Sequence, residues 1–120
     1  MPFQTDLSAD PIHRGTTPKL TYKVEDEDGV FIPGTSLTTI TATIKREDTG
    51  VAIAGFGTDT DIKNLQGNSV DGSGVGTWVL PTTATTCLLS DVGEFFLIEI
   101  KWTYNAGAQA GEHEIRVRIV

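Results

Sequence analysis

The sequence contains one cysteine, few basic residues and no long apolar stretch. A single cysteine cannot form a disulfide within the chain, so a small secreted scaffold held by disulfides is excluded, and Cys87 is interpreted as a buried apolar residue. The chain has 9 Lys and Arg against 16 Asp and Glu, for a formal net charge of -7. Because nucleic-acid affinity comes largely from Lys and Arg that displace counterions, we expect no nucleic-acid partner.

Signals for export and for membrane insertion are also lacking. Residues 1–6 have neither the basic start nor the apolar stretch of a signal peptide. No run approaches the roughly 18 apolar residues that a membrane-spanning helix requires. We therefore expect a chain that is synthesised in the cytoplasm and has no membrane partner.

Short segments in which apolar and polar residues alternate make up much of the chain. In the first of them, Leu20, Tyr22 and Val24 alternate with polar residues. Similar segments occur at residues 39–45, 77–80, 94–104 and 112–120. Alternation with a period of two is typical of half-buried strands, and Gly, Asp, Asn and Thr separate the segments.

These strands predict an all-β, immunoglobulin-like antiparallel β-sandwich that spans residues 19–120, with a β-barrel as the alternative. The length of 120 residues suits one domain with one core. Residues 55–76 are predicted to be a long surface connection with one helical turn near residues 61–66. We expect its apolar anchors to be Ile62, Leu65 and Val70.

The clearest strands, at residues 94–104 and 112–120, predict a hairpin with a loop at residues 105–111. Opposite charges on directly opposed residues favour one register of this hairpin. In that register Trp102 lies opposite His113. The two charge pairs that support it are Lys101 with Glu114 and Glu99 with Arg116.

Residues 1–18 differ from the rest because they carry three prolines and only isolated apolar residues. Proline fixes φ and removes a backbone donor, so this segment predicts an extended N-terminal arm rather than a helix. The arm either docks on a neighbouring surface or is a floppy terminus. If it docks, its expected interaction residues are Phe3, Leu7, Pro11, Ile12 and Pro18.

No residue pattern indicates a catalytic, metal or cofactor site, so we predict that the chain is not an enzyme. The acidic run at residues 25–29 invites a calcium site, but the EF-hand template then places Val24 and Thr35 at ligand positions. The run is better explained as a solvated turn. Residues 72–76 are followed by a strand rather than a helix, which argues against a phosphate loop. His113 lacks a second His at helical spacing, which argues against a zinc-protease motif.

One segment resembles a known family. Residues 102–115, W-T-Y-N-A-G-A-Q-A-G-E-H-E-I, resemble the ending of small immunoglobulin-like virion proteins of tailed bacteriophages, which are encoded among head and head-to-tail joining genes. Residues 48–53 and 72–80 are similar to turn-then-strand elements of the same family. Residues 22–29 resemble the start of phage baseplate and tail modules.

The resemblance implies a non-enzymatic virion protein with no catalytic residues, foremost a minor capsid or decoration protein on the head lattice. A neck or tail and baseplate component is the alternative. The implied partners are a major capsid protein or neck and tail proteins, with the chain as a homo-oligomer or a lattice-bound subunit of the virion.

A hypothesis of another class is a carbohydrate-binding or host-attachment module, because immunoglobulin-like sandwiches also serve adhesion. It predicts exposed aromatic residues, for example Trp78 or Phe56. The alternation places Trp102 and Tyr104 on the core side, where they offer no sugar-stacking platform.

Overall fold

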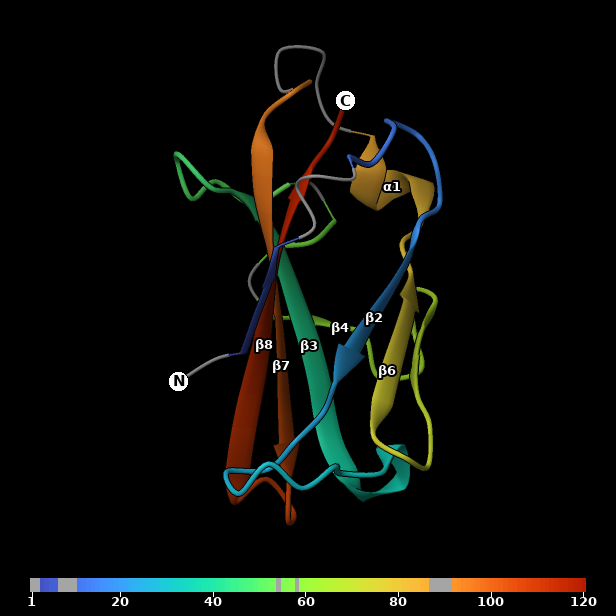
Figure 1. Cartoon of the computed structure of the whole chain (residues 1–120), viewed down its shortest axis with the longest axis vertical. Helices are drawn as coiled ribbons and strands as arrows, with labels where there is room; N and C mark the ends of the chain where they lie inside the picture. The colour runs from blue at the N-terminus through green and yellow to red at the C-terminus, as the bar shows by residue number, and fades with distance from the viewer. Residues whose placement is uncertain (1–2, 7–10, 54, 58, 87–91) are drawn as a thin grey trace.

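The computed structural model describes residues 3–6, 11–53, 55–57, 59–86 and 92–120, with the side chains of residues 3–5 left out. Two β-sheets pack face to face in these residues, one of five strands and one of three (Figure 1). The larger sheet has the order β1-β8-β7-β3-β4 and the smaller has the order β2-β6-β5. The bounds are β1 Phe3–Asp6, β2 Lys19–Lys23, β3 Leu37–Arg46, β4 Thr60–Asp61, β5 Asn68–Val70, β6 Val75–Val79, β7 Phe95–Tyr104 and β8 Gln109–Arg118.

The prediction of an all-β sandwich is confirmed. The smaller sheet combines β2, β6 and β5, and the larger sheet contains β3, β7 and β8. An immunoglobulin-type sandwich divides its B, E, D and C, F, G strands between two sheets in the same way. The finer assignment to the immunoglobulin-like class stays a prediction.

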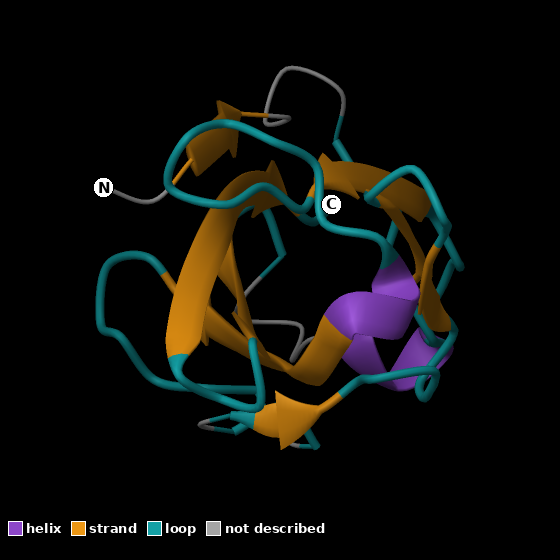
Figure 2. Cartoon of the chain, turned by 90° about the horizontal axis from the view of Figure 1, so that it is seen from below, coloured by secondary structure: helices purple, strands orange, loops and turns teal. Residues whose placement is uncertain are grey.

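The core lies between the sheets because the strands alternate as the sequence indicates. Every second residue of β7 is buried, and Leu20 and Tyr22 of β2 face the same interior. The rings of Phe56 and Trp78 are 5.8 Å apart within this core. The one-turn helix α1, Thr82–Thr85, packs beside one end of the sandwich (Figures 1 and 2). Thr85 Oγ1 donates to the carbonyl of Thr16 at 2.6 Å, which ties α1 to the segment before β2.

The register predicted for the C-terminal hairpin is wrong by two residues. Trp102 lies opposite Gly111, and His113 lies opposite Ile100. The loop is also shorter than predicted, because β8 already begins at Gln109. Among the opposed charges, Lys101 meets Glu112, whereas Glu99 meets Glu114.

Steric fit accounts for the observed register. A Cβ atom at position 111 would lie 2.6 Å from Trp102 Nε1, so only glycine can sit beneath this indole. Two charges of opposite sign that face each other on exposed strand faces stabilise the fold by only about 0.2–1 kcal/mol per pair. This is less than the free energy lost when a buried indole is misplaced. Lys45 of β3 forms an ion pair with Glu99, which offsets the unfavourable Glu99–Glu114 pair.

The connection over residues 55–76 contains β4 and β5, and the helical turn predicted at residues 61–66 is wrong. Asn64 and Gln66 have φ values of 55° and 56°, which a right-handed helix does not allow. Ile62 is a buried anchor as predicted, and its N–H donates to the carbonyl of Ile40 at 2.9 Å. Val70 packs against the core, but Leu65 is 51% exposed and is no anchor.

The described part of the N-terminal segment is extended and lies along the edge of the chain's own larger sheet. β1 pairs in parallel with β8, with Phe3 opposite His113. Further along, the N–H of Ile12 donates to the carbonyl of Arg118 at 2.8 Å, and the N–H of Val120 donates to the carbonyl of Ile12 at 2.8 Å. Ile12 is buried in the core cluster.

Candidate functional site

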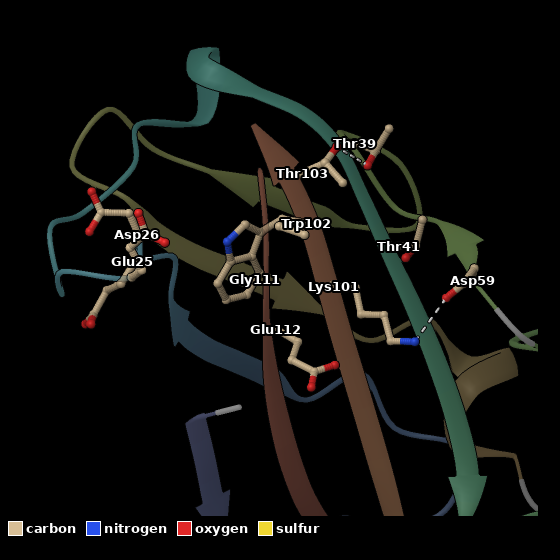
Figure 3. Close-up of a pocket in the computed structure, with 12 residues that line it drawn as sticks. Glu25, Asp26, Thr39, Thr41, Asp59, Lys101, Trp102, Thr103, Gly111 and Glu112 are labelled. Carbon is tan, nitrogen blue, oxygen red and sulfur yellow. Dashed lines mark hydrogen bonds and ion pairs between the residues drawn. The ribbon is translucent and has the colours of Figure 1, made fainter. Parts of the chain in front are cut away.

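A pocket of about 800 Å³ lies where the loop between β2 and β3 meets β3, β7 and the start of β8 (Figure 3). We call it the acidic pocket because five carboxylates and one ammonium group line it among the described residues. The carboxylates belong to Glu25, Asp26, Glu27, Asp59 and Glu112, and the ammonium group belongs to Lys101. The remaining wall includes hydroxyl groups of Thr39, Thr41 and Thr103 and the indole of Trp102.

The acidic loop that supplies three of these carboxylates is held by local hydrogen bonds. Asp26 Oδ1 accepts the N–H groups of Asp28 at 2.9 Å and Val30 at 3.0 Å. Gly29 turns the chain with a φ of 78°, as the sequence predicts. At the stem, Val24 donates to the carbonyl of Gly74 at 2.8 Å and accepts from the N–H of Ile32 at 2.9 Å. The carboxylates are therefore presented on an ordered turn.

Lys101 is the one ammonium group that lines the pocket among the described residues, and it lies opposite Glu112 in the β7–β8 ladder. Lys101 Nζ lies 3.7 Å from Asp59 Oδ1, which is the ion pair drawn in Figure 3. Within the described part of the chain, no basic side chain forms an ion pair with Glu25, Asp26 or Glu112. Glu27 Oε1 accepts a long hydrogen bond of 3.5 Å from Gln109, which is neutral.

The effect of this charge reaches the neighbouring core. Tyr104 is the last residue of β7, and its pKa is raised above the ordinary value of 10.0. Burial is the main cause, and the charges of Glu27 and Asp26 add to it. A carboxylate disfavours a phenolate nearby, so the acidic loop acts on the pKa of Tyr104 in the same direction as burial.

Trp102 brings a buried donor to the pocket wall. Its side chain is 1% exposed, and no described group accepts a hydrogen bond from Nε1. The other tryptophan differs, because Trp78 Nε1 donates to the carbonyl of Gln66 at 2.9 Å. Figure 3 shows the nitrogen edge of the Trp102 indole directed toward Glu25 and Asp26. A buried tryptophan N–H usually has a partner, and leaving it without one costs about 1–3 kcal/mol.

His113 lies apart from the acidic pocket, on the inner face of β8. It is buried, and its ring centroid is 6.3 Å from that of Tyr22. Burial lowers the pKa of His113 below the ordinary value of 6.5. His113 is therefore packed in the core, opposite Ile100 rather than opposite Trp102 as the predicted register had it.

The predicted interaction residues of the arm do not line the acidic pocket. Pro11, Ile12 and Pro18 line a smaller hollow of about 280 Å³ beside the start of β2. The backbone of Phe3 pairs with β8, and Leu7 lies outside the described residues. Cys87, predicted to be buried, also lies outside them.

The sequence did not indicate the acidic pocket. The run at residues 25–29 is visible and does form a turn, but Glu112 joins it only through folding, when β8 is placed beside the loop. Trp102 is a core residue as predicted, yet no pattern in the sequence signals that its N–H is left without an acceptor. The calcium interpretation has no support in the described residues, where no group of three or more His, Cys, Asp and Glu is arranged to hold a metal ion.

Comparison of the chain with protein-family models, with curated proteins and with solved structures finds no match. In the described residues, no helix is long and apolar enough to cross a membrane. A functional proposal therefore depends on the residues of this chain and on the resemblance of its C-terminal segment.

Proposed function

We propose that the chain is a non-enzymatic structural protein of a bacteriophage virion, acting as a minor capsid or decoration protein bound to the head lattice. A neck or a tail and baseplate component is the alternative place for the same subunit. Its partners would be the major capsid protein or neck and tail proteins. The protein would act by binding other virion proteins rather than by catalysing a reaction.

The observation that carries this proposal is an extended N-terminal segment that pairs along a sheet edge of a two-layer body. Four residues of β1 pair with β8, and Ile12 continues the contact at the C-terminal end of the chain. Backbone pairing of this kind is also how an extended segment binds a neighbouring sheet. In the virion, the edge of β8 would make this backbone pairing with a neighbouring subunit.

The segment that resembles virion proteins supports the proposal because its residues shape one hairpin. Its tryptophan stacks over Gly111, and its turn contains positive φ values at Asn105, Ala106 and Gly107. His113 is buried against the opposite sheet. Packing and turn geometry explain the residues of this segment, so the segment indicates the kind of domain. Its resemblance to phage virion proteins indicates the genes among which the chain would be encoded.

The carbohydrate-binding or host-attachment alternative does not find an exposed aromatic at the two residues named for it. It predicts that Trp78 or Phe56 is exposed, and both side chains are buried in the core. The prediction of an exposed aromatic platform at these residues is wrong. A carbohydrate-binding or host-attachment role at another surface stays a prediction.

Mass spectrometry of purified virions from the phage that encodes the chain tests the proposal. We expect the chain to be present in stoichiometric amounts, and cryo-electron microscopy of the same particles to place it on the head. A particle preparation from which the chain is absent, although it is expressed during infection, would overturn the proposal.

A further inference from the structure

We propose that the acidic pocket is a docking site for a basic segment of a partner protein, namely an extended peptide that carries Lys or Arg side chains. The inference goes beyond the proposed function, because it names the chemistry of a partner and the surface that receives it. It concerns the isolated chain and can be tested without a virion.

Charge is the first argument for a basic partner. Glu25, Asp26 and Glu112 line the pocket, and none of them forms an ion pair with a basic residue in the described part of the chain. Like charges gathered around one hollow repel each other, and a cationic side chain placed among them removes that repulsion. A neutral or anionic ligand would leave it in place.

The buried donor of Trp102 is the second, independent argument. Its Nε1–H has no acceptor among the described residues, although the side chain is 1% exposed. The indole nitrogen points toward the same side of the pocket as Glu25 and Asp26 (Figure 3). A bare cation cannot accept this hydrogen, whereas a peptide offers a backbone carbonyl together with its basic side chains. A basic peptide can therefore provide both a cation for the carboxylates and an acceptor for the Trp102 N–H.

Two exposed apolar side chains lie next to the carboxylates on the same loop. Val30 is 60% exposed and Phe31 is 46% exposed. Phe31 pairs with Glu25, and Val30 accepts a hydrogen bond from Asp26 N–H at 2.9 Å. At protein interfaces, apolar contacts of this kind exclude water from the polar contacts next to them.

A sugar is a weaker candidate for the same pocket. The threonine hydroxyls would suit one, but the face of Trp102 lies against Gly111 and is not open for stacking. A neutral sugar also brings no positive charge for the carboxylates. A sugar is kept as an outcome that the experiment can detect.

Nuclear magnetic resonance offers a readout with an internal control, because the chain has two indole N–H groups. The ¹⁵N-labelled protein is titrated with a capped hexalysine and a capped hexaarginine peptide, with hexaglutamine as a neutral peptide of equal length, and with a neutral oligosaccharide. We expect both basic peptides to bind and to shift the Trp102 indole signal. The Trp78 signal should stay in place, because its N–H is already bonded to Gln66. Binding should weaken as NaCl is raised from about 50 mM to about 500 mM.

A pair of double variants with equal charge change locates the site. E25Q/E112Q removes two pocket carboxylates, and each loss is expected to weaken binding about two- to fivefold. E94Q/E114Q removes two carboxylates that do not line the pocket, and it should change the affinity less than twofold. Thermal unfolding of all variants confirms that they are folded.

Three results would overturn the inference. They are the absence of binding by either basic peptide, an equal loss of affinity in both double variants, and a Trp102 signal that moves with an oligosaccharide but not with the peptides. A chain that binds the basic peptides yet is absent from virions would overturn only the proposed function.

Discussion

Gly111 lies directly against the indole of Trp102, so close that a Cβ atom on residue 111 would be 2.6 Å from Nε1. The contact joins opposed residues of β7 and β8 and is the reason that the hairpin adopts its register. It also forms part of the wall of the acidic pocket. One glycine therefore links strand pairing, core packing and the candidate binding site.

Gly111→Ala is expected to destabilise the protein by about 1–3 kcal/mol, because the added methyl group must displace a buried ring in a packed core. Gly72→Ala is the matched control, since a Cβ there meets nothing within 4 Å. It should change the free energy of unfolding by less than about 0.5 kcal/mol. Urea denaturation followed by tryptophan fluorescence measures both. Equal stabilities of the two variants would contradict the steric argument.

The longer strands β2, β3, β6, β7 and β8 were predictable, whereas β4, β5 and the register of the C-terminal hairpin were not. Alternation in β7 has a period of two that any buried strand face must show, so both the strand and its core face follow from the residues. The charge pairs used to align the hairpin contribute little to the free energy of folding. A third strand also supplies a charge that alters the interactions of Glu99. Lys45 contacts Glu99 from β3, which a comparison of β7 with β8 alone cannot reveal.

The candidate site was not predictable for a related reason. Glu25 and Glu112 lie far apart in the sequence, and their separation in space depends on how the loop after β2 crosses to the start of β8. Hydrogen bonds that fix this crossing, such as Val24 N–H to the carbonyl of Gly74 at 2.8 Å, join segments that carry no shared motif. The sequence predicts the acidic turn, but no pattern in it indicates that the turn lies beside Trp102.

Lys45→Gln is expected to lower the free energy of unfolding by about 0.5–1 kcal/mol, because Glu99 then faces Glu114 without its ion-pair partner. In the double variant K45Q/E99Q the loss should largely disappear, since the uncompensated charge is gone. A thermodynamic cycle from urea denaturation at low salt measures the coupling, which should shrink at high salt. Strictly additive effects would show that Lys45 does not offset the Glu99–Glu114 pair.

Alkaline pH should destabilise the protein through Tyr22. Its hydroxyl donates to Asn68 Oδ1 at 2.5 Å in the core, and burial raises its pKa from 10.0 to about 12. The unfolded chain releases this proton near pH 10, whereas the folded chain keeps it until about pH 12. The unfolded state therefore binds fewer protons in this window. The contribution is complete below pH 10 and about 2–3 kcal/mol is lost by pH 12.

Tyr22→Phe separates this effect from the titration of other groups. The variant should be less stable at neutral pH by about 1–3 kcal/mol, because Asn68 Oδ1 loses its buried donor. Its stability should then fall less steeply than that of the wild type between pH 10 and pH 12. Urea denaturation across this range gives both slopes, and ultraviolet absorbance follows phenolate formation. Parallel slopes would mean that Tyr22 does not ionise differently on unfolding.

Ile12→Ala should loosen the N-terminal segment from the sheet edge. Ile12 is 8% exposed and belongs to the core cluster, so its truncation is expected to cost about 2 kcal/mol. Val51→Ala is the control, because Val51 is 63% exposed and its truncation should cost less than about 0.5 kcal/mol.

Hydrogen exchange then tells whether the loss is local. The amide of Val120 donates to the carbonyl of Ile12 at 2.8 Å, so its exchange should accelerate more in Ile12→Ala than that of amides in the β3–β7 ladder. An equal acceleration throughout would indicate that Ile12 supports the whole fold and that the segment does not open by itself. Selective opening would leave the outer edge of β8 free for the backbone of another subunit, which is the step that docking through this segment requires.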